Sequence, residues 1–157
     1  VPLTARDAHA GFVTSPLFLH NAVTSTHSNR EHTMASQLHD KGLALRKKVL
    51  GAAHVEKTLA SVDRYTQPLQ EIVNEYVWGA VWARPGLKPR DRSMITISML
   101  TALNRPQELK THIRAALTNG VTREEVSEIL LHAVVYCGAP AAVDAFRMMG
   151  EVFDAPK

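Results

Sequence analysis

Apolar side chains recur at helical spacing along most of the chain from Gln37 onward. Residues 38–60 form a moderate amphipathic pattern, and residues 106–119, 122–137 and 140–153 each place apolar side chains on one face of a helix. The sequence lacks the alternating pattern that is typical of strands. It therefore predicts an all-α fold, a compact domain of about six helices.

The helical pattern is clearest in residues 67–83, where apolar positions follow i, i+3, i+4 and i+7 for three turns. Thr66 is a candidate N-cap, and Pro68 suits the first turn of the helix. The prediction is an amphipathic helix whose apolar stripe consists of Leu69, Ile72, Val73, Tyr76, Val77, Ala80 and Val81.

Residues 92–103 are apolar nearly all round, and Asp91 is a candidate N-cap for them. Such a helix must be covered on most sides, which favours either a central position or a subunit interface. Further along the chain, Gly120 is expected to end one helix. Thr122 and Glu125 then form a capping box that opens the next helix.

The first 33 residues differ from the rest of the chain. They hold few charges and show no sustained period, and no basic start is followed by an apolar stretch typical of a signal peptide. Met34 resembles the initiator methionine of a protein chain. We therefore expect residues 1–33 to be an extension outside a helical domain formed by residues 34–157. The spacing of the histidines in this segment is too irregular for a metal site: His9, His20, His27 and His32.

Composition is ordinary for a soluble protein with one domain. The 157 residues include 45% apolar and 21% charged residues, and no run approaches the roughly 18 apolar residues of a membrane span. The single cysteine, Cys137, excludes an internal disulfide and suits a reducing cytoplasm, where we expect the protein to reside.

Positive charge is concentrated in one short segment. Arg84, Lys88, Arg90 and Arg92 are opposed only by Asp91. This basic cluster is either a solvated loop or a collar for an anionic ligand. Nucleic acid is a weaker alternative, because no nucleic-acid-binding motif accompanies the cluster.

Two Glu–His pairs at i, i+4 spacing are the main candidates for chemistry. In the first, Glu108 precedes His112, which lies within the apolar stripe of its helix; in the second, Glu128 precedes His132. Each pair is a salt bridge, part of a metal site, or an acid–base pair in which the carboxylate orients the imidazole. For His112, a core histidine satisfied by a partner is a further alternative. Di-iron bundles use Glu-x-x-His, so the spacing of four residues argues against a metal.

Four segments in close order resemble a known family: VWGAVWARPGL, DRSMITISML, RPQELKTHIR and LLHAVVYCGAP. Residues 76–147 are similar to the γ-carboxymuconolactone decarboxylases, and the resemblance extends over about residues 38–154. It implies the alkylhydroperoxidase-D-like helical fold. Redox members of that fold carry Cys-x-x-Cys-x-x-x-His where this chain has Arg105, Glu108 and His112, so thiol chemistry has no basis here.

The resemblance implies a lyase of aromatic-acid breakdown that converts 4-carboxymuconolactone to the β-ketoadipate enol-lactone and CO₂. It implies no cofactor and no metal, since the substrate supplies its own electron sink, and a homo-oligomer, either a trimer or a hexamer. We expect no nucleic-acid or membrane partner, since no nucleic-acid-binding motif and no apolar run of membrane-spanning length is present. A decarboxylase of a related lactone acid, or a non-catalytic helical oligomer that binds a small anion, stays open as an alternative.

Candidate roles follow from this resemblance. The expected catalytic residues are His112 as the proton donor or enolate partner, Glu108 as its orienting group, and His132 as a second donor. The expected substrate-binding residues are Arg92 and Arg105 for the carboxylates, Tyr136 as a further donor, and Trp78 and Trp82 as pocket walls or ordinary core aromatics.

Overall fold

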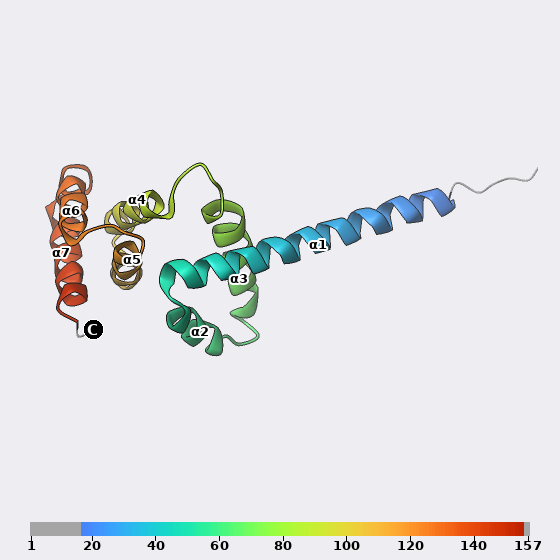
Figure 1. The fold of residues 1–157 in the computed structure, drawn as a ribbon, viewed down its shortest axis with the longest axis horizontal. Coiled ribbons are helices and arrows are strands. Elements are labelled where there is room, and N and C mark those ends of the chain that lie inside the picture. Colours follow the sequence, from blue (N-terminus) through green and yellow to red (C-terminus); the bar gives the residue numbers. More distant parts are fainter. Residues whose placement is uncertain (1–16, 156–157) are drawn as a thin grey trace, which may run out of the picture. The chain divides into compact units, whose positions relative to one another are not determined.

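The structure is a computed structural model that describes residues 17–155, with side chains for residues 33–155. Its described part is helical and contains no strand (Figure 1). None of the described helices has the length and apolar character needed to cross a membrane. The all-α prediction is therefore confirmed. The elements in chain order are α1 (Leu17–Leu50), α2 (Ala52–Ala60), α3 (Gln67–Ile72), the π-helix η1 (Val73–Trp82), α4 (Pro89–Ala102), α5 (Pro106–Thr118), α6 (Arg123–Cys137) and α7 (Ala139–Phe153).

The chain divides into two compact units, residues 1–34 and residues 35–157. α1 begins at Leu17, so a helix occupies part of the segment in which the sequence has no period. That residues 1–33 lie outside the domain stays a prediction. The side chains of the four histidines in this segment lie outside the described residues. All residues proposed below for the site belong to the second unit.

Local sequence signals set the boundaries of the C-terminal helices. The Thr122 side chain accepts a hydrogen bond from the Glu125 backbone N–H, and the Glu125 carboxylate accepts one from the Thr122 N–H. This is the capping box that the sequence predicts. Gly120 and Gly138 have φ values of 90° and 84°. Both conformations favour glycine, and both glycines lie where a helix ends.

Two predicted boundaries were wrong. The pattern over residues 38–60 is interrupted at Gly51, whose φ of 91° ends α1 before α2 begins. α4 starts at Pro89 with Lys88 as the N-cap, so Asp91 lies in its first turn and does not cap it. Proline is well suited to the first helical position, and it starts this helix earlier than the acidic residue indicated.

The predicted helix 67–83 is present, but its second half is a π-helix and its buried face is not the predicted one. Thr66 occupies the N-cap position without a side-chain capping bond, and Pro68 lies in the first turn. Five of the seven residues in the predicted stripe are exposed: Leu69, Ile72, Tyr76, Val77 and Val81. The segment instead buries Asn74, Trp78, Gly79 and Trp82. The predicted stripe was therefore wrong as the buried face, because Trp78 and Trp82 on another side of the helix pack into the protein.

α1 and η1 cross with their backbones in direct contact. A Cβ atom built on Gly42 would lie 1.9 Å from the Asn74 carbonyl oxygen, and one built on Gly79 would lie 2.2 Å from the Leu38 carbonyl oxygen. Only residues without a side chain allow such an approach. The crossing fixes the position of Asn74 against α1.

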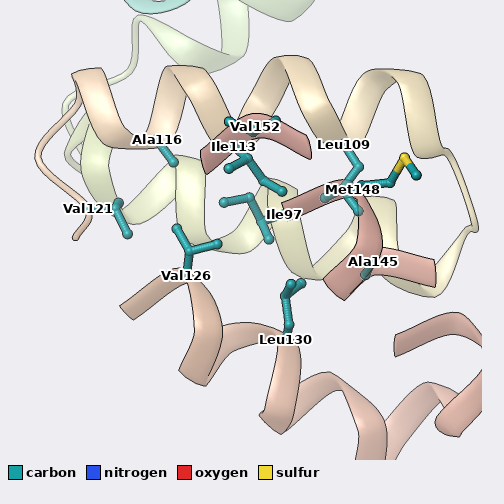
Figure 2. Close-up of a cluster of buried hydrophobic side chains, with 10 residues drawn as sticks. All are labelled: Ile97, Leu109, Ile113, Ala116, Val121, Val126, Leu130, Ala145, Met148 and Val152. Carbon is teal, nitrogen blue, oxygen red and sulfur yellow. The ribbon is translucent and has the colours of Figure 1, made fainter. Parts of the chain in front are cut away.

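The main core lies among the four C-terminal helices. α4 packs against α5, α6 and α7, as expected for a central position, but Ile95 and Met99 stay exposed, so a subunit interface stays open as the other alternative. Figure 2 shows the buried side chains converging from these helices, with Ile97 of α4 next to Ile113 of α5. The remaining members of the cluster are Leu109, Ala116, Val121, Val126, Leu130, Ala145, Met148 and Val152.

The crossing of α1 and η1 can be tested with Gly42→Ala. The new methyl group would meet the Asn74 backbone, which cannot rotate away, so we expect the free energy of unfolding to fall by about 1–3 kcal/mol despite the better helix propensity of alanine. Urea denaturation measures this. Gly86→Ala is the control, because an added Cβ there meets nothing within 4 Å. An unchanged midpoint for Gly42→Ala would contradict the close crossing.

Candidate active site

His112 lines a cavity of about 470 Å³ at which α1, α2, α5 and the helix formed by α3 and η1 meet. This volume suits a small organic ligand. The walls carry several polar groups and two aliphatic residues, Leu50 and Val73. The polar residues of this His112 cavity are Arg46, His54, Thr58, Gln70, Gln107, Glu108, Thr111 and His112.

The surroundings of His112 favour its neutral form. Burial is the largest cause that lowers its pKa, and His54 adds to this effect, while the Glu108 carboxylate opposes it. The Nδ1 atom of His112 is buried and has no hydrogen-bond partner. The Trp82 ring lies beside the imidazole, with 6.5 Å between the ring centroids. His112 is therefore a half-buried imidazole with an unused nitrogen, next to a cavity.

Glu108 lies one turn before His112 and lines the same cavity. Its side chain is exposed, and no hydrogen bond joins it to His112 among the described residues. It acts on the imidazole through its charge. The first predicted Glu–His pair is thus brought together at a cavity, and the orienting role of Glu108 stays a prediction.

Arg46 is the residue of this cavity that sequence reasoning missed. Its side chain is only 6% exposed, and its Nη1 atom donates to Gln70 Oε1 and Asn74 Oδ1, each at 2.9 Å. Its Nε atom is buried without a partner. Burial lowers the pKa of Arg46. The sequence offered only a weak signal, an arginine among other charges in a long amphipathic helix.

The second Glu–His pair lies at a different cavity. Glu128 and His132 of α6 line a volume of about 470 Å³ together with Met94, Ile95 and Ser98 of α4. His132 and Tyr136 are exposed, and their ring centroids are 5.0 Å apart. The structure therefore keeps His132 near Tyr136, as the spacing predicts, but the described chain does not place either of them in the His112 cavity.

The predicted carboxylate-binding arginines also lie away from the His112 cavity. Arg92 donates from Nη2 to the Arg84 carbonyl oxygen, and its Nε atom is buried without a partner. Arg105 is exposed at the start of α5. Trp78 and Trp82 are buried, with ring centroids 4.7 Å apart, and they pack with Val49 in a second small core. Trp82 is both a core residue and the neighbour of His112.

The basic cluster is divided between two structural roles. Arg90 forms an ion pair with Glu125 and so joins the start of α4 to the capping box of α6. Arg84 and Lys88 instead line a basic cavity of about 560 Å³, together with Lys41 and Lys48 of α1. The cluster is therefore not a single collar around one ligand.

The described residues provide no group of three or more His, Cys, Asp or Glu side chains placed to hold a metal ion. The Cys137 thiol is half-buried and donates to the Ala133 carbonyl oxygen, one turn earlier in α6. Arg46 is suited to binding an anion, and His112 next to Glu108 is suited to exchanging a proton with it.

The neutral state of His112 predicts a pH dependence of stability. An unfolded histidine takes up a proton below about pH 6.5, whereas the folded site resists protonation, so stability contributed by this site is present above that pH and is lost as pH falls from it toward the lowered folded pKa. His112→Asn should therefore reduce the loss of stability between about pH 7 and pH 5. Thermal unfolding measures it, with exposed His132→Asn as the control. Parallel pH profiles for wild type and His112→Asn would contradict the assignment.

Comparison with known proteins agrees with the sequence motifs. Residues 67–151 match the model of the carboxymuconolactone decarboxylase family. The chain is 43% identical over 117 residues to a 4-carboxymuconolactone decarboxylase of Acinetobacter baylyi, which covers 74% of this chain and 87% of that protein. It is also 43% identical over 109 residues to a nitrosuccinic acid decarboxylase of Metarhizium robertsii, which covers 69% of this chain and 76% of that protein. The chain belongs to the carboxymuconolactone decarboxylase family.

Proposed function

We propose that this protein decarboxylates 4-carboxymuconolactone to the β-ketoadipate enol-lactone and CO₂ in the His112 cavity, without a metal or an organic cofactor. The observation that carries the proposal is the half-buried His112 with its unused nitrogen, beside a cavity that also contains a buried arginine. The 43% identity to a decarboxylase of this name supports the choice of substrate.

The substrate provides the electron sink for the reaction. The departing carboxylate is attached to the γ-carbon of the lactone, which is conjugated through the ring alkene to the lactone carbonyl. When the bond to CO₂ breaks, its electron pair moves through the alkene to the carbonyl oxygen and gives a dienolate. A proton then adds to the ring carbon next to the carbonyl. The protein has to bind the dianion, stabilise the enolate oxygen and supply that proton.

His112 is suited to the last two of these tasks. A neutral imidazole can donate a hydrogen bond to an enolate oxygen. Two substrate carboxylates would bring negative charge close to the ring and raise its pKa, so that the bound state favours an imidazolium that can deliver the proton. Leu50 and Val73 provide apolar wall, and neutral CO₂ leaves an apolar environment readily.

A second candidate substrate is supported by the nitrosuccinic acid decarboxylase. Nitrosuccinate is not a lactone, but it resembles 4-carboxymuconolactone at the reacting carbon. In both acids this carbon carries the departing carboxylate, an electron-withdrawing group that accepts the electron pair, and a carboxymethyl arm. A related acid with these three groups is therefore the alternative substrate. The remaining alternative, a non-catalytic oligomer that binds a small anion, predicts binding without turnover.

We propose further that the protein is a cytoplasmic homo-oligomer, a trimer or a hexamer. Support comes from large apolar side chains that the described chain leaves exposed on α3, η1, α4 and α6, because a second copy of the chain could cover such side chains. The largest of them include Leu69, Ile72, Tyr76, Ile95, Met99, Leu131 and Val135. His132 and Tyr136 lie on the same exposed face of α6 as Leu131 and Val135, so a role for them at the His112 cavity would require a neighbouring copy of the chain.

Turnover tests the function. Chelated and dialysed protein should consume 4-carboxymuconolactone, as followed by ultraviolet absorbance. His112→Asn should lower kcat at least about 100-fold, because general acid–base groups typically contribute about 10²–10⁴-fold. Glu108→Gln should lower kcat less than His112→Asn does, since the imidazole stays. His132→Asn should also lower kcat, but less than His112→Asn does. A near-wild-type kcat for a folded His112→Asn variant would show that another residue supplies the proton. Recovery of activity only with added metal would contradict the proposed mechanism.

Light scattering tests the assembly. We expect a mass that is a multiple of three chains at micromolar concentration. Met99→Lys should lower that mass, because it places a charge within the exposed apolar surface of α4. Thr118→Lys, at an exposed polar position of α5, is the control and should leave the mass unchanged. A monomer mass for the wild type would refute the proposed assembly.

A further inference from the structure

Arg46 is a buried cation whose charge is not matched by an anion in the described part of the chain. Its two hydrogen-bond acceptors, Gln70 Oε1 and Asn74 Oδ1, belong to neutral amides, and its Nε atom has no partner. Buried charges in proteins are ordinarily paired, because transfer of an unpaired charge from water is costly. Arg46 also lines the His112 cavity. A binding site that retains an unpaired cation beside a cavity is suited to an anionic ligand.

Hydrogen bonds to neighbouring side chains hold the guanidinium in place on the side away from its free Nε atom. Arginine only donates hydrogen bonds, so the oxygen of the Asn74 amide must face it, and the amide nitrogen then faces His39 Nε2 at 3.2 Å. His39 Nδ1 in turn lies 3.3 Å from Asp40 Oδ1. The close crossing of α1 and η1 fixes Asn74 next to Gly42. Gly42 lies one helical turn before Arg46 in α1. This network leaves one edge of the guanidinium without a partner.

We propose that Arg46 binds the carboxymethyl arm that stays on the substrate after CO₂ has left. The proposal rests on the proposed function for the identity of the ligand. A cation bound to the departing carboxylate would stabilise the substrate more than the transition state, because that group becomes neutral CO₂, and it would slow the reaction. A cation bound to the retained arm keeps its interaction throughout and orients the reacting carbon. The arm is also the anionic group that both candidate acids retain.

The other basic residues fit this role less well. Arg92 and Arg105 do not line the His112 cavity, and the cations of the basic cavity, such as Lys41 and Lys48, are exposed to water. Exposed cations bind single carboxylates weakly. Among the residues that the structure describes, Arg46 thus combines burial, an unused donor and access to the cavity of His112.

Calorimetric titration with muconolactone tests the proposal directly. Muconolactone is 4-carboxymuconolactone without the departing carboxylate, and it retains the carboxymethyl arm. Arg46→Gln, which keeps an amide that can bond to Asn74, should weaken binding about 10- to 100-fold, as expected for loss of a hydrogen bond to a charged group. Arg46→Lys should weaken it less, because an ammonium retains the charge but not the planar pair of donors. Circular dichroism checks that each variant is folded.

Two controls distinguish loss of carboxylate binding by Arg46 from a general defect of the variant. Lys47→Gln removes a cation at the next position of α1, where Lys47 is paired with Glu56 at 3.0 Å, and should leave the affinity unchanged. The primary amide made from the muconolactone carboxylate is uncharged, so Arg46→Gln should weaken its binding less than it weakens the binding of muconolactone. The proposal is overturned if Arg46→Gln binds muconolactone as tightly as the wild type does. It is also overturned if the variant loses the neutral amide to the same extent, which would indicate a collapsed cavity.

Turnover of 4-carboxymuconolactone distinguishes this proposal from the function on which it rests. If the wild type turns over the substrate and Arg46→Gln keeps the wild-type KM, the proposed function stands and the role of Arg46 in binding the carboxymethyl arm is refuted. If the wild type binds muconolactone through Arg46 but shows no turnover, the role of Arg46 stands and the proposed reaction is refuted. If the proposed reaction and the role of Arg46 are both correct, Arg46→Gln raises KM about 10- to 100-fold and changes kcat less. The reason is that the retained arm is bound equally before and during the reaction.

Discussion

The contact between α1 and η1 is the constraint on which the candidate site depends. Gly42 and Gly79 allow the two backbones to approach until an added Cβ would overlap a carbonyl oxygen. At this distance the Asn74 amide reaches Arg46, and it can hold the guanidinium although Asn74 is 28 residues further along the chain. The π-helical turn is a rare conformation that is often found at functional sites. Here it places Asn74, Trp78 and Trp82 on the buried side of one segment.

The cavity combines two polar groups that hold different charge states although burial lowers the pKa of both. Burial lowers the pKa of His112 and so favours the neutral imidazole. Arg46 stays a cation because guanidinium holds its proton even when its pKa is lowered. A dianionic acid can satisfy both groups at once: its retained carboxylate neutralises the arginine, and the total negative charge promotes protonation of the histidine. Binding and proton transfer would then be coupled through the charge of the substrate.

Part of this arrangement could be predicted from the sequence. The capping box of α6, the glycine at the end of α5 and the inward direction of His112 depend on residues close together in the chain, so local spacing was sufficient. The exposure of Tyr76 and the burial of Arg46 could not be predicted in this way. A period identifies the apolar face of a helix but not what covers it. The partners that keep Arg46 buried are contributed by α3 and η1, which only the tertiary fold brings to α1.

The central claim is that the His112 cavity is where the anionic substrate binds and reacts. The most direct test is a crystal structure of the protein with muconolactone bound. The account predicts the carboxymethyl group within hydrogen-bonding distance of the Arg46 guanidinium and the lactone carbonyl oxygen facing His112. Muconolactone bound instead beside His132, or in the basic cavity next to Lys41 and Arg84, with the His112 cavity free of ligand, would contradict it.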